Sequence, residues 1–248
     1  MTVLSIYLAY AVALSVALAI AGHRSKAASS GGRPGHRPER VLIIGATGGT
    51  GRHLVSQALQ LGYQVTAFVR DPSKLGLAHP RLTVATGDVL DYASVEAAVR
   101  GQDAVLSALG HKRYYPPNRI LSKGTSNILR AMEAQGVPRL VCETSLGIGD
   151  TAGRMGFYYT FLVIPTVLPF YYWDKTRQER AIGRSRLEWV IVRPGALTDG
   201  EKRGRVHHGR GVGSYLRTVR ISRADVADFM LGQLASDTYL RQGVGVSW

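Results

Sequence analysis

After residue 40, apolar and polar positions follow two alternating patterns, which predicts strands and helices in regular succession. Short aliphatic runs such as 41–44 are typical of strands buried on both faces, and the segments between them carry apolar residues at helical spacing. The predicted strands span 41–44, 64–69, 82–85, 104–106, 139–143 and 187–192. The predicted helices span 49–61, 92–100, 118–135, 174–184 and 222–234. Because these elements alternate with short connections, the pattern predicts an α/β fold with a parallel, doubly wound sheet.

The N-terminal segment has a different pattern, because no charged residue occurs from Thr2 to Ala21. A helix that rises about 1.5 Å per residue would cover roughly 30 Å here, the thickness of a bilayer core. We therefore predict a transmembrane helix over residues 1–22. A cleaved signal peptide is the main alternative, since small residues flank Ile20, although no lysine or arginine precedes the apolar run. A buried helix of a soluble domain is a third reading.

Residues 23–39 are rich in glycine, proline, serine and basic residues, which is the composition of a flexible linker. Basic residues that follow a transmembrane helix tend to stay on the cytoplasmic side. The sequence therefore predicts a membrane-anchored protein whose folded domain, residues 40–248, faces the cytoplasm. The basic side chains can attract anionic lipid headgroups, or the linker can simply be solvated.

Composition narrows the class of protein. Hydrophobic residues make up 45% of the chain and charged residues 19%, which excludes a disordered or collagen-like protein. The single cysteine, Cys142, excludes a disulfide framework and a cysteine-based zinc site. His207 and His208 are adjacent and have no carboxylate or cysteine partner at a suitable spacing, so no metal site is predicted. The net charge of +14 favours anionic partners such as phosphorylated cofactors, acidic lipids or nucleic acid.

The first predicted strand runs into a glycine-rich turn that opens the first predicted helix of the domain. Gly45 permits the tight turn, Gly48 lets the backbone approach a pyrophosphate, and Gly51 lets helix and strand pack closely. The free N–H groups of the helix N-terminus favour a phosphate there. A Walker-type loop is excluded, because Thr50 replaces its second glycine and no lysine follows. This order of strand, turn and helix predicts a Rossmann dinucleotide site, with a purely structural turn as the alternative. The predicted contacts in the turn are Gly45, Thr47, Gly48, Gly49, Thr50 and Gly51.

The residue after the second strand selects between the two nicotinamide cofactors. A carboxylate here binds the adenosine ribose of NAD, whereas an arginine accommodates the 2′-phosphate of NADP. Arg70 occupies this position, and Lys74 is close enough to add a second cation. The neighbouring Asp71 is a carboxylate that can bind the ribose of NAD, so NAD is the alternative cofactor. The sequence therefore predicts NADP, with NAD as the less favoured cofactor.

These residues resemble the atypical branch of the short-chain dehydrogenase/reductase superfamily, which contains the NmrA-like proteins and the flavin reductase/biliverdin reductase B group. The resemblance covers roughly residues 40–248. The motifs that carry it are Gly45-x-x-Gly48-x-x-Gly51, Val69-Arg70-Asp71, Gly87-Asp88-Val89, Ser107-Ala-Leu-Gly110, Thr144-Ser145 and Val192-Arg193-Pro194-Gly195.

The resemblance implies further contacts with the cofactor. They are Asp88 and Val89 at the adenine, Ser107 and Ala108 at the ribose and nicotinamide, and Pro194 and Gly195 near the nicotinamide. Ser145 matches the active-site serine of the flavin-reductase-like members. Those members have no tyrosine–lysine pair and can reduce substrates that stack against the nicotinamide, so that the cofactor supplies the chemistry.

A second reading of the active site uses Tyr171 and Lys175. Carbonyl reductases of the superfamily that this chain resembles use a tyrosine as proton donor and a lysine four residues later that holds the ribose. The same spacing here places both side chains on one helix face. Ser145 would polarise the substrate oxygen. The alternative is that Tyr171 only packs, since it lies in an aromatic stretch, and Pro169 suggests that it lies in the first turn of its helix.

Residues 157–173 are almost entirely apolar or aromatic. Pro165 and Pro169 argue against one long straight helix. The segment can be buried core, a lid over an apolar substrate, or a surface at a membrane interface. The last two readings indicate a lipophilic substrate such as a quinone, an isoprenoid or a sterol-like carbonyl.

Together these patterns predict an NADP-dependent oxidoreductase that transfers hydride from NADPH to a flavin, quinone or lipophilic carbonyl. The alternative is a non-catalytic NAD(P) sensor of the NmrA-like type. The basic stretch at 202–223 is read as a solvated face that can help to hold cofactor phosphates or acidic lipids. Nucleic-acid binding is a less favoured reading, and the predicted partner is a small apolar or aromatic substrate.

Overall fold

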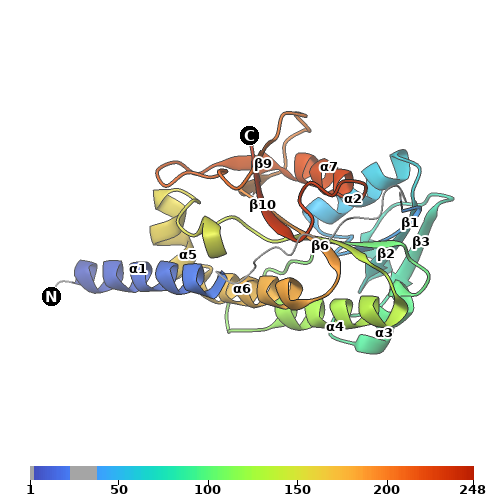
Figure 1. Ribbon diagram of the computed structural model, residues 1–248, viewed down its shortest axis with the longest axis horizontal. Helices are drawn as coiled ribbons and strands as arrows, with labels where there is room; N and C mark the ends of the chain where they lie inside the picture. Colours follow the sequence, from blue (N-terminus) through green and yellow to red (C-terminus); the bar gives the residue numbers. More distant parts are fainter. Residues whose placement is uncertain (1–2, 23–37) are drawn as a thin grey trace.

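The computed structural model describes residues 3–22 and 38–248 and contains a twisted sheet covered on both faces by helices (Figure 1). The sheet has the strand order β3-β2-β1-β4-β5-β6-β10-β8, and only β8 runs antiparallel to its neighbour. The strands are β1 (Arg40–Ile44), β2 (Gln64–Val69), β3 (Leu82–Thr86), β4 (Ala104–Ser107), β5 (Arg139–Glu143), β6 (Glu188–Pro194), β8 (His207–Gly209) and β10 (Gln242–Ser247). Two short strands, β7 (Ala196–Thr198) and β9 (Arg220–Ser222), pair separately. The predicted doubly wound parallel sheet is confirmed.

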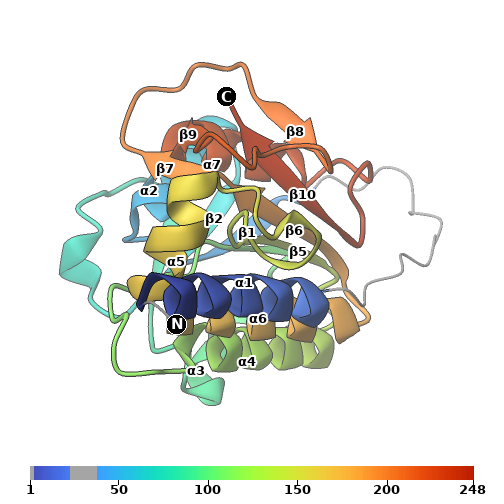
Figure 2. The ribbon, with the colours of Figure 1, turned by 90° about the vertical axis from the view of Figure 1, so that its left-hand side faces the viewer.

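The helices form one layer on each face of the sheet (Figure 2). The helices of the described residues are α1 (Val3–Gly22), α2 (Gly49–Gln60), α3 (Tyr92–Val99), α4 (Ile120–Gln135), α5 (Ile164–Thr166), α6 (Pro169–Arg184) and α7 (Arg223–Gly232). Successive residues of β1 serve opposite layers: Ile43 packs in the core under α2 and α7, and Ile44 packs in the core under α3, α4 and α6. This two-sided burial explains why the central strands are continuous aliphatic runs.

Hydrogen bonds to a side chain of α6 determine where α4 begins. The carboxylate of Asp174, on α6, accepts hydrogen bonds from the backbone N–H groups of Leu121 at 2.9 Å and Ser122 at 3.3 Å, and from the Ser122 hydroxyl. These bonds satisfy free donors of the first turn of α4, so the helix begins at Ile120 rather than at residue 118. The helix predicted at 174–184 begins earlier, because Pro169 occupies its first turn.

The N-terminal segment is a helix, but it differs from the predicted transmembrane helix. Residues Val3–Gly22 form α1, but in the part of the chain that the structure describes no helix is both long and apolar enough to cross a membrane. The predicted transmembrane helix at 1–22 is therefore wrong. One side of α1 packs on the domain: Ala11 is buried, Leu14 packs against a small apolar cluster, and the Tyr7 hydroxyl donates to the carbonyl of Phe161 at 2.5 Å. The linker predicted at 23–39 lies almost entirely outside the described residues.

The aromatic segment before α6 is folded in short pieces. A five-residue π-helix, Tyr159–Val163, is followed by α5 and then by α6, so the prediction that no long straight helix forms here is confirmed. Figures 1 and 2 show α1 running beside this segment and beside α6, with which it is in contact. The segment therefore contributes both to the core around Ile164 and to an exposed surface that includes Phe157 and Tyr158.

Candidate functional site

The site begins where the carboxyl ends of β1 and β4 meet. The connections from these two adjacent strands lead to opposite faces of the sheet, and in open α/β sheets ligands bind at such a switch point. Gly45 follows β1 with φ +80°, and a Cβ atom built on it would lie 2.5 Å from the carbonyl oxygen of Ala108. The N–H of Ala108 in turn donates to the carbonyl of Ile44 at 3.0 Å. Only glycine fits at position 45, and this packing brings Ala108 beside the turn.

The turn leads directly into the N-terminus of α2. A Cβ atom on Gly51 would lie 2.0 Å from the carbonyl oxygen of Gly45, so the helix can pack this closely on the turn only with glycine there. The N-cap Gly48 supplies no side-chain cap, and the first turn of α2 has no acidic residue. The N–H of Gly48 donates to the carbonyl of Gly45 at 2.9 Å. The N–H groups that fit a phosphate are therefore those of the first turn of α2, which starts at the exposed Gly49 next to the half-buried Thr47.

Thr50 is turned away from the exposed side of the turn. Its side chain is buried, and its hydroxyl donates to the carboxylate of Glu143 at 3.1 Å. Burial raises the pKa of Glu143, while Lys175, the Thr50 hydroxyl and Arg223 act in the opposite direction. Thr50 therefore offers a bound phosphate only its backbone. Glu143 was not identified from the sequence, because it reads as the last residue of a strand.

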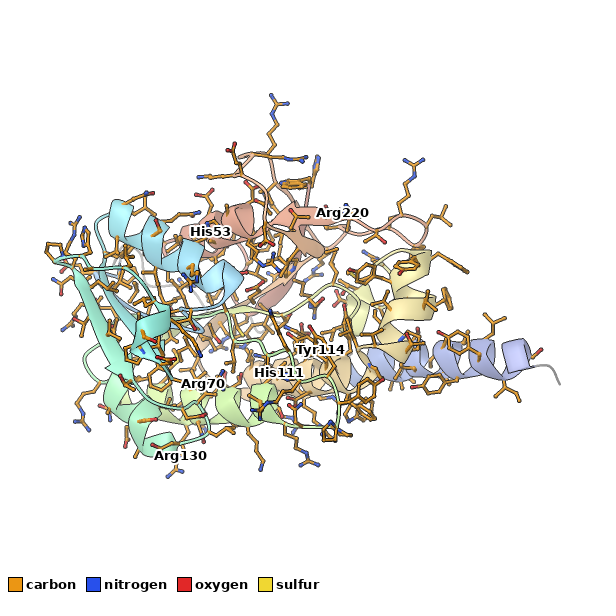
Figure 3. The ribbon with its side chains drawn as sticks, turned by 180° about the vertical axis from the view of Figure 1, so that it is seen from behind. His53, Arg70, His111, Tyr114, Arg130 and Arg220 are labelled. Atoms are coloured by element: carbon orange, nitrogen blue, oxygen red, sulfur yellow. The ribbon has the colours of Figure 1, made fainter. Side chains whose placement is uncertain are left out.

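The adenosine end of the predicted site lies at the end of β2. Asp71 accepts hydrogen bonds from the N–H of Ser73 at 3.1 Å and from its hydroxyl at 2.6 Å, and pairs with Lys74 at 3.2 Å. The Ser73 hydroxyl and Lys74 together lower the pKa of this carboxyl group. Arg70 is exposed and forms no ion pair with any residue that the structure describes (Figure 3). The Asp71 carboxylate thus caps the turn that follows it, while the Arg70 guanidinium is available to bind an anion.

The contacts implied by the family resemblance lie along the same edge of the sheet. Asp88, after β3, accepts a hydrogen bond from the N–H of Leu90 at 2.9 Å, and the neighbouring Val89 is buried against Gly124. Ser107 is buried at the end of β4, next to Ala108. Further along the edge, the carbonyl of Pro194 accepts a bond from the N–H of Leu146 at 3.0 Å. Gly195 follows, and its backbone lies too close to Val219 for a side chain. The contacts of these six residues with the cofactor stay predictions.

The structure pairs Ser145 with Tyr172, a residue that the sequence did not single out. The Ser145 hydroxyl lies 3.0 Å from the hydroxyl of Tyr172, not that of Tyr171, and the Tyr172 hydroxyl donates to the carbonyl of Leu146 at 3.2 Å. Burial raises the pKa of Tyr172. Consecutive helical residues point about 100° apart. Because α6 begins at Pro169, Tyr172 points into the core and Tyr171 points toward the loop after β4. Tyr172 therefore orients Ser145.

Tyr171 and Lys175 do lie together. The ammonium group of Lys175 lies 5.2 Å from the centre of the Tyr171 ring and donates to the carbonyl of Thr144 at 2.9 Å. The Tyr171 ring also packs edge to face against two rings of the loop after β4, His111 with centroids 5.0 Å apart and Tyr114 at 5.7 Å. Figure 3 labels His111 and Tyr114. Ser145, Tyr171 and Lys175 thus share one corner of the site, beside Gly110.

His111 is a candidate that the sequence did not reveal. Its Nδ1 atom accepts a hydrogen bond from the N–H of Arg113 at 3.1 Å, so the neutral ring carries its proton on Nε2. That Nε2 atom is buried and has no hydrogen-bond partner among the described residues. Burial is the main cause that lowers the pKa of His111, and it disfavours the charged ring. It therefore presents an unused donor next to Tyr171. Its position in a loop gave no periodic signal.

A network of buried ion pairs and hydrogen bonds connects to the segment that carries Ser145. The guanidinium of Arg193 binds both carboxylate oxygens of Glu179, at 3.0 and 2.7 Å, and a third nitrogen pairs with Asp150 at 2.5 Å. Glu179 also accepts a hydrogen bond from the Thr144 hydroxyl at 2.6 Å. The network ties β6 and α6 to the residue that precedes Ser145, so it holds the predicted active-site residues in place.

Arg223 is a further missed candidate, and it lies against the phosphate turn. A Cβ atom on Gly49 would lie 2.4 Å from the Cδ atom and 2.5 Å from the Nε atom of Arg223. The guanidinium pairs with Asp199 at 2.5 Å, and the Asp199 side chain is 89% exposed. Exposed ion pairs are weak, so a phosphate can replace Asp199 as the partner. From the sequence Arg223 was only one of several cations in a basic stretch.

This position leads to a prediction for Arg223→Met. We expect the variant to bind NADPH roughly tenfold more weakly, because it loses one charge-assisted contact to the pyrophosphate. Binding of adenosine 2′-monophosphate, which carries no phosphate at the 5′ position, should stay unchanged. Calorimetric titration of both ligands measures the two effects, and equal losses for both ligands would contradict the assignment.

Comparison with known proteins agrees with this geometry. The family described as NAD(P)H-binding matches residues 45–237. An uncharacterised chloroplastic protein of Arabidopsis thaliana is 30% identical over 178 residues, 68% of this chain and 63% of its own length. An isoflavone reductase homologue of Zea mays is 34% identical over 146 residues, 50% of this chain and 47% of its own. The chain thus spans less than two thirds of either relative.

A solved structure extends the comparison to three dimensions. ChuY, an anaerobillin reductase from Escherichia coli O157:H7, superposes with a TM-score of 0.67 at 25% identity, covering 84% of this chain and 96% of that one. The glycine turn, the open N-terminus of α2 and the free Arg70 fit a phosphate-bearing dinucleotide. This chain therefore belongs to the NAD(P)H-binding family, as its resemblance to the atypical short-chain dehydrogenase/reductases predicted.

Proposed function

We propose that the protein is an NADPH-dependent reductase of a small apolar or aromatic acceptor, such as a flavin, a quinone or a lipophilic carbonyl compound. The observation that carries the proposal is the meeting of Ser145, Tyr171 and Lys175 at one corner beside the phosphate turn. The names of two relatives, an isoflavone reductase homologue and an anaerobillin reductase, support a reductase activity. When bound, NADPH supplies the hydride, and the protein supplies position and protons.

Each residue of this corner has a proposed task. Ser145, which lies 3.0 Å from the Tyr172 hydroxyl, turns its proton from this contact to the oxygen of the acceptor. Lys175 is held by the carbonyl of Thr144, and its remaining N–H groups are available to the ribose of the cofactor. Tyr171 donates the proton, since its ring lies beside Lys175 and its hydroxyl lies near Gly110. The aromatic rings around Tyr171 favour a planar or apolar acceptor.

The preference for NADPH rests on the end of β2. Arg70 is exposed and free, whereas Asp71 is engaged as a cap and in an ion pair. We expect Arg70→Ala to weaken NADPH binding about 10- to 100-fold and to leave NADH binding nearly unchanged, because only NADPH carries the 2′-phosphate. Arg100→Ala, at an exposed position at the opposite end of the sheet, is the matched control. Equal losses for both nucleotides would contradict the assignment.

The proposed chemistry is tested by turnover of NADPH with flavin mononucleotide, a naphthoquinone and a lipophilic ketone. We expect Ser145→Ala and Lys175→Met to lower kcat roughly 100-fold with an acceptor that the wild type reduces. Lys123→Met, which removes an exposed cation from α4, should keep wild-type rates. Tight NADPH binding without turnover of any acceptor would favour the alternative of a non-catalytic NAD(P) sensor, and equal rates in all variants would refute the assigned corner.

A further inference from the structure

A cleft lies on the side of α6 that faces away from Lys175. It has a volume of about 480 Å³ and is lined by α1, by the residues just before α4 and by the first three turns of α6. This volume lies within the range of about 300–1,000 Å³ that is common for small-molecule sites. Figures 1 and 2 show that α1 runs along α6 at this place, so α1 supplies one wall.

Helix geometry separates the cleft from the NADPH site. Phe170, Trp173 and Arg177 are three and four residues apart, so they form one face of α6, and all three line the cleft. Lys175 lies two residues from both Trp173 and Arg177, which turns it by about 200° around the helix. Lys175 is buried against the end of β5, where it bonds Thr144. A ligand in the cleft would therefore not occupy the site of hydride transfer.

The walls of the cleft are apolar and aromatic. Trp173 and Phe170 are 36% and 37% exposed, so both rings are accessible to a ligand in the cleft. Tyr10 and Leu14 of α1 face them across the cleft. These rings and the leucine offer a surface on which an alkyl chain or a flat ring can be buried.

Two cations lie among these apolar walls. Arg119 and Arg177 line the cleft, no acidic side chain lines it, and neither arginine forms an ion pair with a residue that the structure describes. The guanidinium of Arg177 lies 5.7 Å from the centre of the Trp173 ring, a cation–π contact that leaves its N–H groups available. Two arginines can hold one carboxylate with directed, charge-assisted hydrogen bonds.

From this arrangement we propose that the cleft binds a small amphiphilic carboxylate. The apolar body of the ligand lies between Leu14, Phe170 and Trp173, and its carboxylate meets Arg119 and Arg177. The binding is separate from the NADPH chemistry proposed above, so it does not depend on that proposal. Because Trp173 lines the cleft, its fluorescence reports directly on occupancy.

The experiment uses the full chain and decanoate as the probe, at concentrations where it is monomeric. We expect a saturable change in tryptophan emission, and we expect decanol, which has the same chain without the charge, to bind at least about tenfold more weakly. Arg177→Met should weaken decanoate binding about tenfold and abolish the preference over decanol. Arg184→Met, an exposed arginine of the same helix outside the cleft, is the matched control.

Two further measurements decide the assignment. Trp173→Phe should remove the emission change, while calorimetry should still detect decanoate binding, because phenylalanine keeps an aromatic wall. The circular dichroism spectrum and the thermal unfolding temperature should be unchanged in Arg177→Met, which shows that the variant is folded. The proposal would be overturned by binding that does not saturate, by equal affinity for decanoate and decanol, or by an Arg177→Met variant with wild-type decanoate affinity.

Discussion

Gly45→Ala is expected to weaken NADPH binding by at least about a hundredfold, because the substitution deforms the turn that meets the phosphates. Residue 45 has φ +80°, which costs a residue with a side chain about 1–2 kcal/mol. The new Cβ atom would also lie 2.5 Å from the carbonyl oxygen of Ala108, at the junction of β1 and β4. Neither strand can retreat easily, since both are buried in the centre of the sheet.

The matched control is Gly101→Ala. Gly101 has a similar φ of +74°, but a Cβ atom there meets nothing within 4 Å, and the residue lies before β4 at the far end of the sheet. The control therefore has the same backbone strain without the collision at the turn. We expect it to lose some thermal stability and to keep wild-type NADPH affinity. If both variants bound NADPH equally well, the turn would not be the phosphate site.

Arg193→Leu is expected to lower the free energy of unfolding by about 3–5 kcal/mol, as is usual when one partner of a buried ion pair is removed. The Arg193 and Glu179 side chains are only 7% and 6% exposed, and the arginine provides two of the hydrogen bonds to the carboxylate. The substitution leaves Glu179 as a buried charge with the Thr144 hydroxyl as its remaining partner. Urea unfolding followed by circular dichroism measures the loss.

The double variant Arg193→Leu with Glu179→Leu separates the ion pair from simple packing. Removing both partners also removes the unpaired charge, so we expect the double variant to recover at least half of the lost stability. If it is as unstable as the sum of the two single variants, the two residues act independently and the network does not support the site as described.

The central sheet could be predicted from the sequence because its strands are buried on both faces. Runs such as 41–44 and 139–143 have no other stable location than the middle of a covered sheet, and the helices between them show clear periodicity. The strands at the far edge could not be predicted. β10 contains two glycines in six residues, and the short β8 pairs with it from a distant part of the chain, so tertiary contacts define both.

The N-terminal helix shows how composition alone can mislead. An uncharged segment of this length is compatible with a membrane span and with a helix that packs on protein. Packing of Ala11 and Leu14 against the domain is a tertiary property, and no local pattern in the sequence records it.

Part of the candidate site could also be predicted from the sequence. The glycine turn and Arg70 follow from local order along the chain, because strand, turn and helix are consecutive there. The partner of Ser145 was not predictable, since either Tyr171 or Tyr172 can face it until the start of α6 is known. Glu143, His111 and Arg223 reach the site through contacts between distant segments, so they are visible only in the folded chain.

The most direct test of the account is a titration of the protein with NADPH and with NADH, followed by nicotinamide fluorescence, with flavin and then quinone added to the same cuvette. We expect NADPH to bind much more tightly than NADH and to be consumed once an acceptor is present. If neither nucleotide binds, the assignment of the glycine turn and of Arg70 is contradicted, and the proposed function with it.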